Sequence, residues 1–191
     1  MRKVRLNKLI LLLLIMSIAL TGCSTVDKKG DVDKDSFVIG ISQLADHPAL
    51  DDARLGFEDG LKELGVNAEI IYKNAQGDIP TSLSIAQKFV KDEVDLIYAI
   101  ATSAAQTAKQ ATEEIPILFS AVTDPVKAEI VVDWDNVGGN ITGTSDMAPI
   151  ASQLKMFKEI DPNINKIGII YNTSEANSEI QLEEVKKLAP Q

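Results

Sequence analysis

Val94-Asp95-Leu96-Ile97-Tyr98-Ala99-Ile100-Ala101 is the stretch of sequence that decides the fold. Its apolar residues follow one another without alternation, which is typical of a strand covered on both faces in a parallel sheet. A second run, Ile115-Pro116-Ile117-Leu118-Phe119-Ser120-Ala121-Val122, has the same character. Each run leads directly into small polar residues. The sequence therefore predicts two buried strands that end in polar turns.

Strand and helix patterns alternate around these two runs. We expect further strands at 37–41, 68–72 and 141–144, and helices that begin near Pro48, Pro80 and Ala104. Strand–helix pairs of this length imply right-handed βαβ units. The predicted fold class is therefore α/β, with a parallel-sheet lobe over residues 37–145 and flanking helices. Glycines 56 and 60 fall on the apolar face of the first helix, which suggests close packing on the sheet.

The pattern changes after Pro125 and resumes only near the end of the chain. A helix is predicted after Pro149, a strand at Lys166–Tyr171 and a last helix at Glu175–Leu188, with Ser174 as its N-cap. One strand and two helices cannot make an independent core. We therefore expect residues 146–191 to be a crossover and the start of a truncated second α/β lobe.

The first 22 residues have the pattern of a bacterial lipoprotein signal peptide. A basic start is followed by an apolar run that ends in Leu20-Thr21-Gly22-Cys23, with small residues before a cysteine that is to be acylated. Cys23 is the only cysteine, so no internal disulfide is available to explain it. The alternatives are an ordinary secretory signal or an uncleaved anchor. Residues 23–36 are polar and charged, which predicts a flexible tether.

The chain is acidic, with a formal net charge of −9. Loss of residues 1–22, which hold four basic and no acidic residues, would change it to −13. This charge disfavours nucleic acid and anionic membrane surfaces as partners. Membrane attachment is therefore expected through the lipid at Cys23 alone.

The candidate ligand site consists of polar residues at the expected carboxyl ends of strands, where ligands of parallel α/β sheets collect. Hydroxyls and free helix N–H groups can hold a carboxylate, and an aspartate can pair with an ammonium group, so the set suits a zwitterion. The alternative for each residue is a helix cap or an Asx or ST turn that needs no ligand. The candidates are Thr102, Ser103, Thr123 and Asp124, with Gln43 and Asp146 on adjoining loops.

Enzymatic and metal-dependent functions are disfavoured. The sequence has no G-x-S-x-G elbow, P-loop or G-x-G-x-x-G motif. The acidic pairs Asp51-Asp52 and Glu113-Glu114 are interpreted as solvated charges, because neighbours on a helix point in different directions. His47 is the only histidine, so a metal site is not expected. We predict no catalytic residue, no metal and no cofactor.

Several short segments resemble the substrate-binding lipoproteins of ABC importers, in particular the family whose characterised members bind tryptophan or tyrosine. The resemblance spans Phe37 to about Leu188, and its most specific parts are His47-Pro48-Ala49-Leu50-Asp51 and Val122-Thr123-Asp124-Pro125-Val126. Members of this family are similar to type I periplasmic binding proteins, with two lobes joined by three crossovers. The sequence departs from that pattern by ending before most of the second lobe.

The resemblance implies a lipid-anchored solute-binding protein of an ABC importer on the extracytoplasmic side of the cell membrane. Its expected ligand is an aromatic amino acid or a similar small zwitterion, and its expected protein partner is the ABC permease. An alternative is a ligand-sensing lipoprotein that reports to a membrane receptor. A hydrolase or racemase is a third possibility, which the missing motifs disfavour.

Overall fold

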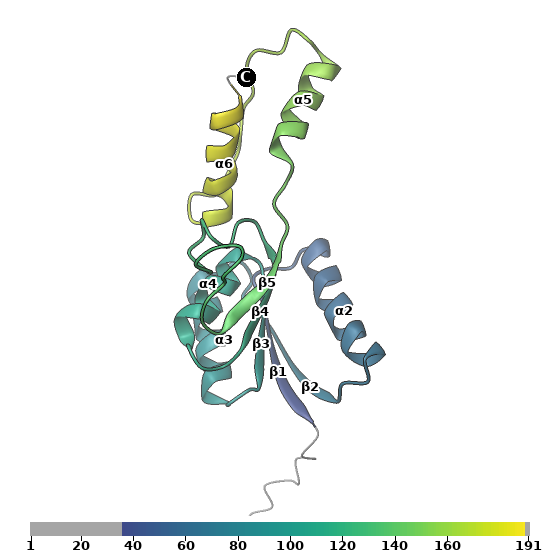
Figure 1. Cartoon of the computed structure of the whole chain (residues 1–191), viewed down its shortest axis with the longest axis vertical. Coiled ribbons are helices and arrows are strands. Elements are labelled where there is room, and N and C mark those ends of the chain that lie inside the picture. Colours follow the sequence, from purple (N-terminus) through teal and green to yellow (C-terminus); the bar gives the residue numbers. More distant parts are fainter. Residues whose placement is uncertain (1–35, 190–191) are drawn as a thin grey trace, which may run out of the picture. The chain divides into compact units, whose positions relative to one another are not determined.

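A parallel sheet is the centre of the computed structural model, which describes residues 36–189. Its strands are hydrogen-bonded in the order β2-β1-β3-β4-β5 (Figure 1). The predicted α/β class with a parallel sheet is confirmed. The predictions for the signal peptide, for Cys23 and for the tether up to residue 35 lie outside the described residues. The strands are β1 (Phe37–Gln43), β2 (Ala68–Asn74), β3 (Leu96–Ile100), β4 (Ile117–Val122) and β5 (Ile141–Ser145).

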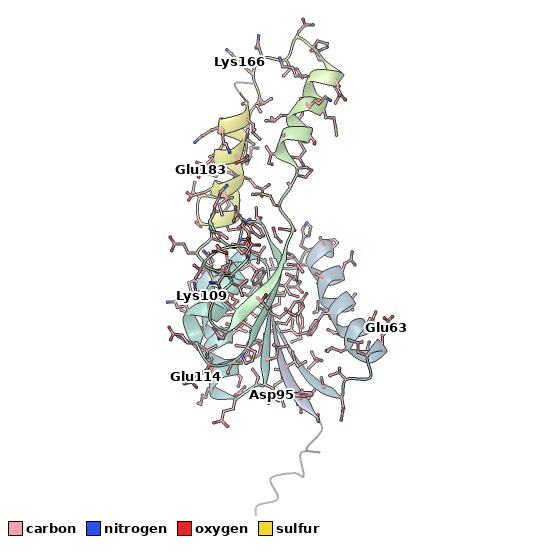
Figure 2. All side chains as sticks on the ribbon, in the orientation of Figure 1. Glu63, Asp95, Lys109, Glu114, Lys166 and Glu183 are labelled. Atoms are coloured by element: carbon pink, nitrogen blue, oxygen red, sulfur yellow. The ribbon has the colours of Figure 1, made fainter. Side chains whose placement is uncertain are left out.

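Helices connect the first four strands and cover both faces of the sheet (Figure 1). Helix α2 (Pro48–Glu63) lies on one face, and α3 (Ile79–Lys91) and α4 (Thr102–Ala111) lie on the other. The start of α2 is capped by His47, whose Nδ1 accepts from the backbone N–H of Ala49 at 3.2 Å. Charged side chains such as Glu63 and Lys109 are exposed on the outer surfaces of these helices (Figure 2).

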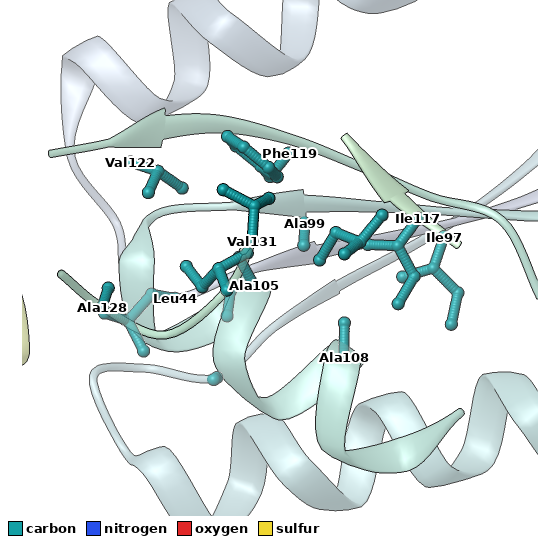
Figure 3. Close-up of a cluster of buried hydrophobic side chains, with 14 of the residues drawn as sticks. Leu44, Ile97, Ala99, Ala105, Ala108, Ile117, Phe119, Val122, Ala128 and Val131 are labelled. Carbon is teal, nitrogen blue, oxygen red and sulfur yellow. The ribbon is translucent and has the colours of Figure 1, made fainter. Parts of the chain in front are cut away.

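Each face of the sheet has its own apolar core. Under α2, residues Ile39, Ile41, Tyr98 and Ile100 of β1 and β3 are at most 4% exposed. On the opposite face, small residues of α4 pack against larger side chains of β3 and β4 (Figure 3). The run of alanines in α4 brings its backbone close to the sheet. That second core includes Ile97, Ala99, Ala105, Ala108, Ile117, Phe119 and Val122.

Two glycines allow close approach, but they are not the predicted ones. A Cβ at Gly40 would lie 2.7 Å from the ring of Phe89 in α3. A Cβ at Gly143 would meet the backbone of Phe119 in the neighbouring strand. Around Gly56 and Gly60 no atom lies within 4 Å of such a Cβ, so the prediction of close packing there is wrong. Close packing is needed within the sheet layer and under α3, and not along α2.

After β5, residues 146–189 contain helices but no strand. These are α5 (Ile150–Ile160) and α6 (Ala176–Leu188). The strand predicted at Lys166–Tyr171 is wrong, because within the described residues no other strand pairs with this segment. Ser174 is not the N-cap of α6; Glu175 holds that position, and the N–H of Ser174 donates to Asn172 Oδ1. Across residues 36–189, no helix has both the length and the apolar character that a membrane crossing requires.

Candidate functional site

Buried polar side chains gather where β1, β3 and β4 end. These strands are neighbours in the sheet and parallel, so their carboxyl ends lie at one edge. The polar residues are at most 6% exposed, which is unusual for their types. The structure therefore brings five of the six predicted site residues to one buried edge. They are Gln43 at the end of β1, Thr102 and Ser103 at the start of α4, and Thr123 and Asp124 after β4.

Asp146 is the exception among the predicted residues. Its side chain is exposed after β5, and its backbone N–H donates to Val122 O at 3.0 Å. It does not cap α5, whose N-cap is Pro149 without a side-chain hydrogen bond. The preceding Ser145 donates from Oγ to Thr123 O at 2.8 Å and ties β5 to the turn after β4. Asp146 thus lies at the rim of the edge.

The strand order places a topological switch point between β1 and β3. The chain leaves β1 through α2 on one face of the sheet, and it enters β3 from α3 on the other face. In open α/β sheets, ligands bind outside the carboxyl ends of the strands at such a point. Gln43 pairs in register with Ile100 across this point, and Thr102 follows two residues later. Gln43, Thr102 and Ser103 therefore lie beside the position that the topology favours.

The backbone turns sharply from β3 into α4 at Ala101. This residue has φ 88° and ψ 156°, a conformation that glycine adopts readily and alanine rarely. Because of this turn, α4 begins at Thr102, two residues earlier than the predicted start at Ala104. Ala101 is the N-cap, and no side chain caps the first turn of the helix. The helix therefore presents its first N–H groups at the carboxyl edge without a side-chain acceptor.

The hydroxyls of Thr102 and Ser103 do not serve as caps of α4. Thr102 Oγ1 accepts from the backbone N–H of Thr123 at 3.4 Å, which joins the start of α4 to the end of β4. Ser103 Oγ is buried and has no hydrogen-bond partner in the structure. The capping alternative considered for these two residues is therefore not what the geometry shows.

Asp124 combines a structural role with a remaining acceptor. Its Oδ1 accepts from the N–H groups of Val126 and Lys127 at 3.1 and 3.0 Å, as expected for an Asx turn. Its Oδ2 lies 3.6 Å from Lys127 Nζ. The lysine is half exposed and also lies 3.8 Å from Glu184. Oδ1 of Asp124 is thus used by the turn. Oδ2 lies beside the ammonium group of Lys127, and the ammonium group of a ligand could take the place of that lysine.

Sequence reasoning missed Asp51. It lies in the first turn of α2, and its Oδ1 accepts from Gln43 Nε2 at 2.9 Å. The interpretation of both Asp51 and Asp52 as solvated charges is therefore wrong for Asp51. A carboxylate in the first turn of a helix that starts just after β1 is the signal that could have indicated this contact.

The edge offers groups for a small zwitterion. Uncapped N–H groups and the hydroxyl of Ser103 can bind a carboxylate at the start of α4. The Oδ2 oxygen of Asp124, which now lies 3.6 Å from Lys127 Nζ, could accept from an ammonium group. Within residues 36–189, no cluster of three His, Cys, Asp or Glu side chains is placed to hold a metal ion.

Known proteins resemble this chain in sequence. The sequence profile of a family described as ABC transporter substrate binding protein matches residues 38–191. A tyrosine-binding protein of Clostridioides difficile (strain R20291) is 48% identical over 182 residues, which is 89% of this chain and 52% of that protein. The chain therefore spans about half the length of the curated relative that it matches.

Solved structures show the same relationship. The structure of an ABC domain in complex with L-Trp from Streptococcus pneumonia matches with a TM-score of 0.78 and 38% identity, over 81% of this chain and 54% of that one. The ligand-free, open structure of a substrate binding protein with adhesive properties from Clostridium difficile matches with a TM-score of 0.66 and 46% identity. That match also covers 81% of this chain and 54% of the other.

Proposed function

Because this chain belongs to the ABC transporter substrate-binding protein family, we propose that it binds a small solute for an ABC importer at the carboxyl edge of its sheet. The solute that we propose is an aromatic amino acid, tyrosine or tryptophan. The matched tyrosine-binding protein and the matched complex with L-Trp support this choice. The family is one of binding proteins, in line with the prediction that the chain is not an enzyme.

One observation carries the proposed site: the buried Ser103 hydroxyl has no partner and stands in the uncapped first turn of α4. A buried polar group without a partner costs about 1–3 kcal/mol, and such groups are rare in folded proteins. A ligand carboxylate at the start of α4 would supply an acceptor for the hydroxyl and for the N–H groups of the turn. Thr102 and Thr123, already bonded to each other, would form the wall beside it.

The ammonium group of the amino acid is assigned to Asp124. Its Oδ2 lies 3.6 Å from the exposed Lys127 Nζ, so the ligand would displace that cation. Asp124→Asn keeps the turn, because the amide oxygen can still accept from Val126 and Lys127. It removes the charge that would pair with the ligand.

Nuclear magnetic resonance titration of the full chain tests this proposal. Addition of L-tyrosine or L-tryptophan is expected to shift the amide signals of Thr102, Ser103 and Asp124. Loss of a desolvated charge partner costs roughly 2–5 kcal/mol, so Asp124→Asn should weaken binding by about thirtyfold or more. Asp135→Asn, at an exposed carboxylate, is the matched control. Shifts confined to other residues, or equal affinity in Asp124→Asn, would refute the assignment.

We also propose that the protein is held at the extracytoplasmic face of the cell membrane by lipid on Cys23, next to its permease. Leu20-Thr21-Gly22-Cys23 supports this anchor. Intact mass of protein extracted from membranes should show a diacyl- or triacylglyceryl adduct on a chain that lacks residues 1–22. Cys23→Ser should abolish the adduct and release or mis-process the protein. Unchanged membrane retention and mass in that variant would contradict the anchor.

A further inference from the structure

The side chain of Gln43 is held in one orientation at the end of β1. It is fully buried, and its Nε2 donates to Ala45 O at 2.8 Å and to Asp51 Oδ1 at 2.9 Å. Both partners are acceptors only, so the nitrogen of the amide must face them and its oxygen must face away. Since Asp51 belongs to α2, this bond joins the helix to the end of the strand.

Backbone hydrogen bonds extend this network to the neighbouring strands. The N–H of Ala75, after β2, donates to Gln43 O at 2.9 Å, and the N–H of Gly77 donates to Leu44 O at 2.8 Å. The N–H of Leu44 donates in turn to Ile100 O, at the end of β3, at 3.3 Å. The ends of β1, β2 and β3 are thus one hydrogen-bonded unit, and Gln43 lies at its centre.

We infer that Asp51 is a positioning residue for the carboxyl edge: it fixes the amide of Gln43, and Gln43 fixes the Leu44–His47 loop beside the β1/β3 switch point. The inference rests on the proposed function of that edge. Asp51 acts through Gln43 and does not touch the ligand. Asp52, the next residue of α2, is exposed and makes none of these contacts, so it provides a matched control.

Two substitutions at Asp51 separate the hydrogen bond from the charge. Asp51→Asn keeps an oxygen that can accept from Gln43 Nε2, whereas Asp51→Leu has a similar size and no acceptor. The test compares both variants of the full chain, purified in a mild detergent, with Asp52→Leu. It measures proton exchange of the Gln43 side-chain amide and the affinity for L-tyrosine.

We expect the Gln43 amide to exchange at least tenfold faster in Asp51→Leu and at the native rate in Asp51→Asn and Asp52→Leu. Loss of one buried hydrogen bond predicts about tenfold weaker binding of L-tyrosine in Asp51→Leu. Asp51→Asn should restore affinity to within about threefold of the native chain, by the same relation. If Asp51→Leu does not fold, Gln43→Met, which removes the donor, should show the same loss of affinity.

Three results would overturn the inference: an unchanged Gln43 amide in Asp51→Leu, equal losses in Asp51→Asn and Asp51→Leu, or an equal loss in Asp52→Leu. Failure of the proposed function looks different. In that case the unmodified chain would bind neither L-tyrosine nor L-tryptophan, while the exchange of the Gln43 amide would still decide whether Asp51 fixes it.

Discussion

The same tripeptide occurs twice in this chain, once buried and once exposed. Ile39-Gly40-Ile41 lies in β1, where the two isoleucines are 3% and 0% exposed. Ile167-Gly168-Ile169 lies between α5 and α6, where the two isoleucines are 40% and 42% exposed. The ring of Phe89 fills the space beside Gly40, whereas nothing lies within 4 Å of a Cβ at Gly168. Identical local sequence therefore does not decide burial; the neighbouring elements do.

The difference extends to the regions around the two tripeptides. Up to β5, an apolar core lies on each face of the sheet. Among the described residues after β5, 146–189, only Ile150 and Ile180 are buried. Apolar side chains such as Ile160, 74% exposed, and Ile170, fully exposed, face solvent there. A hollow of about 580 Å³ lies between α5 and the segment near residue 166. The first region thus has closed apolar cores, whereas the second leaves large apolar side chains in contact with solvent.

The largest expected effect comes from truncating the matched isoleucines. Ile41→Ala should lower the free energy of unfolding by about 2–5 kcal/mol, because it leaves a cavity in a closed core. Ile169→Ala should change it by about 0.5 kcal/mol or less, as is usual for surface positions. Urea denaturation of the two variants measures both. Similar losses in the two variants would mean that the second tripeptide is packed in solution.

Adding a methyl group to the matched glycines tests the same contrast from the opposite direction. In Gly40→Ala the new Cβ would meet the ring of Phe89 at 2.7 Å, so overpacking should cost about 1–3 kcal/mol. Gly168→Ala meets nothing and should be neutral or slightly stabilising, because it reduces the freedom of the unfolded chain. Denaturant midpoints compare them. A neutral Gly40→Ala would indicate that α3 packs less closely on β1 than described.

A smaller effect is expected at Tyr98, compared with the half-exposed Tyr171. Tyr98 stacks on Phe57 at 4.2 Å between ring centroids, and its hydroxyl pairs with Ser120 Oγ at 2.6 Å. Tyr98→Phe should therefore lose about 1 kcal/mol of stability at neutral pH. Tyr171→Phe should lose almost none.

The pH dependence of the two tyrosine variants sharpens this prediction. Burial raises the pKa of Tyr98, and the hydrogen bond to Ser120 opposes the rise only in part. The folded state thus binds the phenolic proton more tightly than the unfolded state, whose pKa is about 10. The contribution of Tyr98 to the free energy of unfolding is therefore fully present below about pH 10, the unfolded pKa. It is lost as the pH rises through the higher pKa of the folded state. In Tyr98→Phe, the free energy of unfolding should fall less steeply at alkaline pH than in the native chain. An unchanged slope of stability against pH would argue against burial of the Tyr98 hydroxyl.

The sequence predicted those elements whose own residues are almost all apolar, because such segments are buried wherever they pack. The apolar runs at β3 and β4 became central strands, and the polar residues after them came together at one edge. The start of α4 was placed two residues late because the rare backbone conformation of Ala101 has no composition signal. The composition of Lys166–Tyr171 predicts a strand, but a segment forms a strand only where a neighbouring strand provides hydrogen bonds.

The positions of most candidate residues were predictable, whereas their contacts with one another were not. Strand ends in a parallel sheet meet at one edge, which located Thr102, Ser103, Thr123 and Asp124. The contact between Gln43 and Asp51 depends on how α2 turns back over β1, and its one sequence signal is a carboxylate in the first turn of the helix that follows β1. Asp146 is predicted with the others because it lies where the chain would leave the first lobe, but its side chain is exposed after β5.

Amide hydrogen exchange of the full chain, with and without L-tyrosine, tests the central claim that the carboxyl edge of the sheet is the binding surface. We predict that the ligand slows exchange at residues 101–104 and 122–125, where α4 begins and β4 ends. Exchange at residues 166–171 should be fast and should not respond to the ligand. Slowing that is confined to 166–171, or no slowing at either strand end, would contradict the account.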